Sequence, residues 1–150
     1  MKRSSIFFRV FMAVSSLVVS APGIGRQSVT LDVQGMHLNV EFYTPQVVRV
    51  YSTPVGRPYE KQSLSVVKTP EQVQVTTETR LPWISMVSSD LKVEVNVETG
   101  GVYFYDSRGN RLLVGKDYGT QFTPFNDAGT PSYTVRQGFV LDPDEAIYGV

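Results

Sequence analysis

The sequence has no cysteine, one histidine and one tryptophan, and its 14 basic residues are balanced by 14 acidic ones. The absence of cysteine excludes disulfide bonds, thiolate metal ligands and a cysteine nucleophile, and the lone His37 excludes a site built from several histidines. A net charge of zero gives no electrostatic basis for binding nucleic acid. We therefore expect no metal, no other cofactor and no nucleic-acid partner.

The length of 150 residues limits what else the chain contains. It suits about one domain, and it leaves no room for an additional barrel domain of about 250 residues. Walker, dinucleotide-binding and Gly-x-Ser-x-Gly motifs are also absent from the sequence. Neither a phosphate cradle nor a nucleophile elbow is expected.

The N-terminus has the layout of a secretory signal. Basic residues precede a largely apolar run at 10–19, and small residues follow at 20–25. The run is shorter than the ~20 residues that span a bilayer as a helix, although a signal anchor is the alternative interpretation. We predict a signal peptide at 1–25, cleaved within about 20–25.

Removal of the signal would change the charge balance. It takes away Lys2, Arg3 and Arg9 and no acidic residue, so 11 basic residues face 14 acidic ones and the net charge becomes −3. No cysteine stands near the predicted cleavage site to carry a lipid anchor. We expect an exported protein, periplasmic or secreted, that has no membrane contact after cleavage.

From residue 29 onward, apolar and polar residues alternate with period two. Met36, Leu38, Val40 and Phe42 form one such series, and residues 91–98 alternate strictly. Shorter alternations occur at 48–50 and 73–77. This pattern is typical of strands with one buried and one solvated face, and helical spacing is not sustained over the ~11 residues that would indicate a helix.

Turn-forming residues separate these segments. The Thr-Gly-Gly sequence at 99–101 predicts a tight hairpin, and residues 106–110 predict a second one. Further breaks are expected at 44–45, 53–58 and 68–70.

The C-terminal third is expected to begin with the longest irregular stretch, at 115–131, followed by a long strand at 133–141 interrupted by Gly138. Short strands at intervals of roughly 8–12 residues predict an all-β, antiparallel β-sandwich at 26–150. A chain of this size buries about two thirds of its unfolded surface, which suffices for a core without disulfides.

Acidic residues are the first candidates for hydrolytic chemistry, because glycoside cleavage needs two carboxyl groups facing each other. The Asp-Pro-Asp-Glu sequence at 142–145 is the most obvious group, but it is equally the sequence of a turn after a strand. Glu94 and Glu98 belong to the polar face of a predicted strand. His37 should point to solvent and serve a structural role, so we expect no catalytic residue.

The irregular stretch is the best candidate for ligand contact, because aromatic rings and hydrogen-bonding side chains occur together in small-molecule sites. The alternative is that its two phenylalanines anchor the stretch in the core. The candidate residues are Phe122, Phe125, Asn126 and Asp127, with Tyr118 and Tyr133 beside them.

Three stretches in this order cover about residues 28–150 and resemble one known family. They are VVRVY at 47–51; LKVEV at 91–95 continued by TGGVYFYD at 99–106, Gly109, Leu112 and Leu113; and QGFVLDPDEAIYGV at 137–150. The family is glycoside hydrolase family thirty-one, the α-glucosidases and α-xylosidases.

The resemblance implies an amino-terminal β-sandwich, similar in fold to galactose mutarotase, that packs on a (β/α)₈ barrel. In the family both catalytic aspartates lie on the barrel, and a substrate-contacting loop follows a Tyr-Gly-Leu-Gly stretch. The sequence here ends at Tyr148-Gly149-Val150, with Val150 in place of the leucine. We therefore expect a truncated product that carries over no catalytic residue.

The function predicted on this basis is a non-catalytic domain of an exported α-glucosidase-like or α-xylosidase-like hydrolase, with the missing barrel as its partner in cis. One alternative is a stand-alone secreted module that binds carbohydrate or acts in adhesion. Another is a structural cell-surface domain that pairs through its strand edges.

Overall fold

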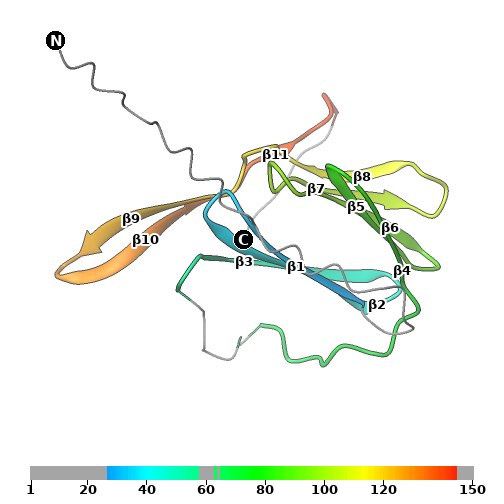
Figure 1. Ribbon diagram of the computed structural model, residues 1–150, viewed down its shortest axis with the longest axis horizontal. Coiled ribbons are helices and arrows are strands. Elements are labelled where there is room, and N and C mark those ends of the chain that lie inside the picture. The colour runs from blue at the N-terminus through cyan, green and yellow to red at the C-terminus, as the bar shows by residue number, and fades with distance from the viewer. Residues whose placement is uncertain (1–26, 58–62, 64, 145–150) are drawn as a thin grey trace, which may run out of the picture.

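The computed structural model describes residues 27–57, 63 and 65–144, and the predicted signal peptide lies outside them (Figure 1). These residues form antiparallel strands and no helix, which confirms the all-β prediction; accordingly, no membrane-spanning helix occurs among them. The strands are β1 (Ser28–Val33), β2 (Met36–Thr44), β3 (Val47–Pro54), β4 (Thr76–Arg80), β5 (Trp83–Val87), β6 (Leu91–Asn96), β7 (Val102–Asp106), β8 (Arg111–Gly115), β9 (Gln121–Asp127), β10 (Thr130–Arg136) and β11 (Phe139–Val140).

One layer is a three-stranded sheet in the order β1-β2-β3. A two-residue turn joins β1 to β2, with Gln34 at φ 49° and Gly35 at φ 74°. Two successive positive φ angles are characteristic of a type I′ hairpin. This turn places Val33 opposite Met36 and thereby sets the register of the whole pair.

The other layer is a six-stranded sheet in the order β11-β8-β7-β6-β5-β4. The hairpins predicted at 99–101 and 106–110 are confirmed as the β6–β7 and β7–β8 connections. Gly100 at φ 72° and Gly109 at φ 86° adopt the left-handed conformation that those turns require.

The core lies between the two sheets. The inward side chains of β2, namely Met36, Leu38, Val40 and Phe42, are at most 1% exposed, as the alternation predicted. They pack with apolar residues of the six-stranded sheet and with Val73 from the long connection before β4. The core residues opposite β2 include Ile84, Met86, Val93, Val95 and Val102.

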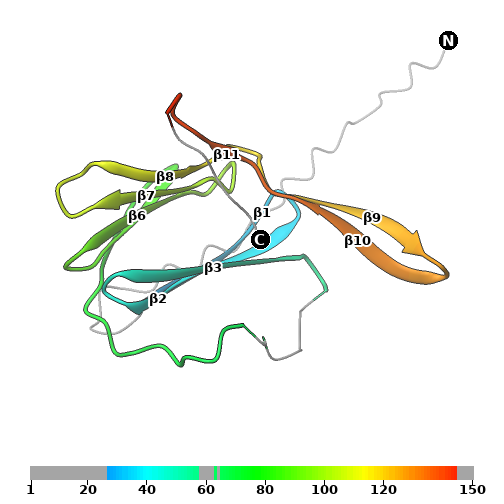
Figure 2. The same ribbon diagram turned by 180° about the vertical axis from the view of Figure 1, so that it is seen from behind.

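The prediction of an irregular stretch at 115–131 is correct for residues 116–120 and wrong from Gln121 onward. Strands β9 and β10 form a two-stranded hairpin there that projects away from both sheets (Figures 1 and 2). We call it the arm. Pro124 and Pro131 suggested a loop, but both strands of an isolated hairpin are edges, where a residue without an N–H is tolerated.

Three other boundaries differ from the prediction. The alternation at 91–98 stops at Asn96, because its Oδ1 accepts the backbone N–H groups of Glu98 and Thr99 and turns the chain. The strand expected at 133–141 divides at Gln137 and Gly138: β10 pairs with β9, whereas β11 pairs with β8.

The segment 73–77 was expected to form a strand, but β4 begins only at Thr76. Val73 is buried in the core, and its N–H is accepted by Gln27 Oε1 at 2.8 Å. Gln27 Nε2 also donates to the carbonyls of Phe42 and Glu71. This one amide side chain therefore holds the connection before β4 against the three-stranded sheet.

Candidate functional site

The outer face of the three-stranded sheet carries polar side chains in cross-strand rows. The register places Asp32 opposite His37 and His37 opposite Thr53, and in the next row Asn39 lies between Thr30 and Tyr51. Because side chains alternate between faces, both rows lie on the side away from the core.

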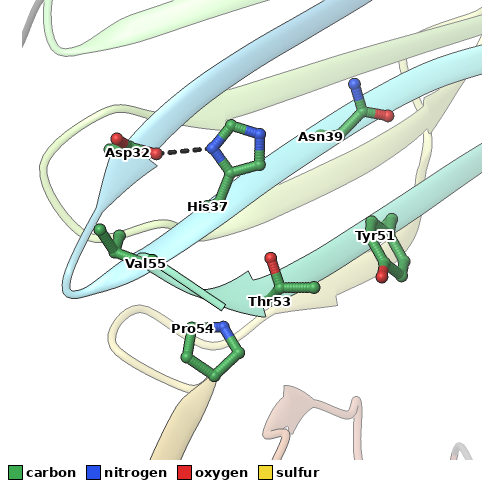
Figure 3. Close-up of a pocket in the computed structure, with 8 residues that line it drawn as sticks. Asp32, His37, Asn39, Tyr51, Thr53, Pro54 and Val55 are labelled. Atoms are coloured by element: carbon green, nitrogen blue, oxygen red, sulfur yellow. Dashed lines mark hydrogen bonds and ion pairs between the residues drawn. The ribbon is translucent and has the colours of Figure 1, made fainter. Parts of the chain in front are cut away.

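A cavity of about 420 Å³ lies over these rows (Figure 3). Its volume falls within the ~300–1,000 Å³ range of small-molecule sites. Strands β1, β2 and β3 all contribute to it, and the end of β3 and the residues after it close one side. The lining residues are Asp32, His37, Asn39, Tyr51, Thr53, Pro54, Val55 and Gly56; we call this cavity the outer pocket.

Asp32 and His37 form the most polar part of the outer pocket. His37 Nδ1 lies 2.7 Å from Asp32 Oδ1, and the two side chains are 50% and 59% exposed. When the neutral imidazole donates its Nδ1–H to the carboxylate, Nε2 is left as an acceptor. The expectation that His37 points to solvent is confirmed.

The second row combines an amide with an aromatic ring. Asn39 Nδ2 donates to Thr30 Oγ1 at 2.8 Å, and an amide has further donor and acceptor capacity beyond one such bond. The Arg49 guanidinium lies 5.2 Å from the ring centre of Tyr51 and donates to the Tyr43 hydroxyl. This cation–π contact holds the Tyr51 ring at the pocket wall.

The four residues predicted for ligand contact lie on the arm, away from the outer pocket. Phe122 packs against the core cluster and meets Tyr133 edge to face at 6.4 Å. Phe125 is 45% exposed, and Asn126 Oδ1 accepts the N–H of Gly129 in the hairpin turn. Asp127 ends β9, and none of the four lines the outer pocket.

The remaining candidates have local partners. Asp142 forms an ion pair with Arg111 across the β8 edge, and residues 143–144 form a turn, as expected. Glu145 lies outside the described residues. Tyr118 is 54% exposed, on the connection that leads into the arm.

Sequence reasoning missed the outer pocket as a site. The alternation already predicted that residues 37 and 39 face away from the core, and the same rule applies to Asp32, Tyr51 and Thr53. What it did not provide was the register, which depends on the Gln34-Gly35 turn and on a bulge in β2 before Thr44. Without the register, nothing indicated that these side chains lie side by side.

The part of the chain that the structure describes contains no group of three or more His, Asp or Glu side chains arranged to hold a metal ion. A smaller cavity of about 240 Å³ opens between the sheets where β3 faces β7, β8 and β11. Its walls combine apolar side chains and glycines, including Val48, Val50, Phe104 and Phe139, with the polar side chains of Ser52, Lys116, Thr120 and Gln137.

No family model matches the sequence. Two solved structures share the fold, both described as GH31 α-xylosidases, that is, members of glycoside hydrolase family 31. The enzyme from Xanthomonas citri matches with a TM-score of 0.68 and 21% identity over 79% of this chain. The enzyme from a soil metagenome, solved with xylose, matches with a TM-score of 0.65 and 16% identity over 79% of this chain.

The match spans only 13% and 20% of the length of these two enzymes. At such identities the likeness establishes the fold. The resemblance predicted from three stretches of sequence is thus confirmed at the level of the fold: this chain has the architecture of one part of a GH31 α-xylosidase.

Proposed function

We propose that this chain is the amino-terminal β-sandwich domain of an exported GH31-type glycoside hydrolase, in which it supports the catalytic barrel and shapes the rim of the sugar site. The observation that carries the proposal is the asymmetry of the fold match, which covers 79% of this chain and at most 20% of the enzymes. A domain that accounts for so small a share of a hydrolase leaves most of the enzyme to other segments.

The absence of catalysis within this domain is part of the proposal. Hydrolysis of a glycosidic bond requires two carboxyl groups about 5–10 Å apart around the substrate. The outer pocket, the larger of the two described cavities, is lined by one carboxylate, Asp32, which is engaged with His37. We infer that the acid and the nucleophile lie outside this domain.

A hydrolase assay tests this inference directly. The 150-residue chain, incubated with aryl α-xylosides and α-glucosides, should release no more phenol than buffer does. The positive control is a longer protein expressed from the gene sequence that continues past the codon for Val150. A longer product that includes a barrel should hydrolyse one of these substrates. Turnover by the 150-residue chain alone would overturn the proposal.

The same gene reading separates the alternatives. A Gly-Gln or Gly-Glu pair after Val150, followed by an open reading frame long enough to encode a barrel, supports the proposal of a hydrolase domain. A stop codon directly after Val150 instead favours a stand-alone module that binds carbohydrate or acts in adhesion.

Export is a separate element of the proposal and rests on residues 1–25. Expression of the intact chain should yield a product outside the cytoplasm whose N-terminus, read by Edman or mass-spectrometric sequencing, begins within about residues 21–26. A chain with Lys2 and Arg3 changed to glutamate should remain in the cytoplasm. A cytoplasmic product that retains Met1 from the unaltered chain would refute this element.

A domain that normally packs against a barrel has a surface that is covered in the parent enzyme. Leu112 and Val140, at the β8–β11 end of the six-stranded sheet, are 49% and 46% exposed, and the adjoining Leu141 is 42% exposed. The isolated chain should associate through this apolar surface. Sedimentation should show oligomers that a Leu112→Lys, Val140→Lys variant reduces; a monodisperse monomer that binds no hydrophobic dye would contradict this expectation.

A further inference from the structure

We propose that the outer pocket binds a neutral sugar ring. The inference deepens the proposed function, on which it rests only for the choice of a sugar as the ligand. It starts from the cross-strand rows, which place five hydrogen-bonding side chains from three strands around one cavity.

The chemistry of the lining residues selects for hydroxyl groups. With Nδ1–H donated to Asp32, His37 Nε2 accepts a hydrogen bond, Asp32 also accepts hydrogen bonds, and the Asn39 amide both donates and accepts. Each sugar hydroxyl is both a donor and an acceptor. A ring that carries several hydroxyls therefore finds a complementary partner in each row.

The electrostatics of the outer pocket disfavour charged ligands. Among the described residues no lysine or arginine lines it: the Arg49 guanidinium lies on the Tyr51 ring and donates to Tyr43, and an anion in the pocket meets the Asp32 carboxylate. A cation finds only that one carboxylate, which already bonds to His37 at 2.7 Å. A neutral ligand avoids both difficulties.

Tyr51 supplies the apolar contact that a sugar ring also needs. Its ring stands at the pocket wall, with the Arg49 guanidinium 5.2 Å from the ring centre. Pro54 and Val55 extend the apolar surface at the end of β3 (Figure 3). Flat aromatic and aliphatic surfaces combined with a few convergent polar groups are the usual composition of small-molecule sites.

The positions of these side chains are fixed before any ligand arrives. They stand on three hydrogen-bonded strands whose opposite faces form the core, and the Asp32–His37 and Asn39–Thr30 bonds restrict three of the lining side chains further. Such preorganisation lowers the entropy lost when a ligand binds.

The experiment is a saturation-transfer NMR titration of the 150-residue chain with methyl α-D-xylopyranoside and, separately, with D-glucuronate. We expect saturable binding of the neutral xyloside and weaker binding of glucuronate. His37→Ala and Asn39→Ala should each weaken xyloside binding roughly fivefold to tenfold, the usual effect of losing one hydrogen-bonding partner. Thr77→Ala, an exposed change on β4 of the other sheet, should leave the affinity unchanged.

Three outcomes would overturn the inference. They are the absence of saturable xyloside binding by the unaltered chain, an affinity of the His37→Ala and Asn39→Ala variants that equals that of the unaltered chain, and tighter binding of glucuronate than of the xyloside. Unchanged thermal unfolding of each variant checks that the fold is intact. None of these results alters the outcome of the hydrolase assay, so failure of this site and failure of the proposed function are distinguishable.

Discussion

The hydroxyl of Ser88 donates a hydrogen bond to the carbonyl of Pro45 at 2.7 Å, and so joins the two sheets at one end of the sandwich. Ser88 stands in the connection between β5 and β6, whereas Pro45 stands in the turn between β2 and β3. The same Oγ accepts the backbone N–H of Leu91 at 3.0 Å. One side chain thus shapes its own turn and ties that turn to the opposite layer.

Replacement of Ser88 by alanine should lower the free energy of unfolding by roughly 1–2 kcal/mol, because it removes the tie to Pro45 and a partner of the Leu91 N–H. Denaturant titration measures the change. Ser85→Ala, on β5 of the same sheet, is the matched control and should change stability by less than about 0.5 kcal/mol. Equal effects of the two substitutions would show that the tie contributes nothing.

Gly100 is required for two separate reasons, and a pair of variants separates them. Its φ of 72° disfavours any side chain, and a Cβ there would overlap Met36 Cε and approach Val33. Gly109 has a similar φ of 86° and nothing within 4 Å of an added Cβ. Gly109→Ala should therefore cost only the backbone penalty of about 1–2 kcal/mol, and Gly100→Ala should cost roughly 1–3 kcal/mol more. Thermal or denaturant unfolding that ranks the two equally would contradict the overlap.

The turn of the arm contains a residue that is poorly suited to its conformation. Ala128 has φ 46° in a two-residue turn with Gly129, a geometry in which asparagine is preferred. Ala128→Asn should stabilise the hairpin by about 0.5–1 kcal/mol, and Ala128→Val should destabilise it. Because the arm is exposed along most of its length, amide exchange in β9 and β10 is the appropriate measurement. Identical exchange rates in the two variants would refute the assignment of strain to this position.

The pKa of Tyr103 predicts a loss of stability at alkaline pH. Burial, together with a hydrogen bond to Asp117, raises the pKa of this phenol from 10.0 to about 12. The folded state therefore favours the neutral phenol, and its contribution to stability is complete below pH 10 and is lost as the pH rises towards 12.

A Tyr103→Phe variant isolates this effect. It should be less stable than the unaltered chain at neutral pH, and the difference in unfolding free energy should shrink above about pH 10. Tyr118→Phe, a substitution of an exposed tyrosine, is the control for the loss of one phenol group and should not change the pH dependence of stability. A difference that stays constant up to pH 12 would show that Tyr103 does not carry the alkaline transition.

Much of the fold could be predicted from the sequence, because a sandwich core imposes period two on its strands. The alternation at 36–42 identified four of the most deeply buried side chains, and the Thr-Gly-Gly and Asp-Ser-Arg-Gly-Asn sequences identified two hairpins correctly. The prediction failed where local chemistry was ambiguous. Pro124 and Gly129 indicate a loop in most contexts, and only the antiparallel pairing of β9 with β10 makes them part of a hairpin.

The candidate site was harder to predict than the fold, since it depends on contacts between strands. His37 could be assigned to an outward face, but its neighbours Asp32 and Thr53 are set by register on both sides of β2. A shift of one residue in either pairing would move these partners to the opposite face. The aromatic residues of the arm had a stronger local signal, yet they lie outside the outer pocket.

The arm begins and ends at the same place. Gln121 and Arg136 are paired across its base, and just outside them the Gly138 N–H donates to the carbonyl of Gly119 at 3.0 Å. Phe122, near this base, also packs against the core cluster, so the base must be kept. Beyond the Phe122–Val135 pair the arm can be lengthened or shortened without rebuilding the sandwich, because the ends of the hairpin stay at the same spacing.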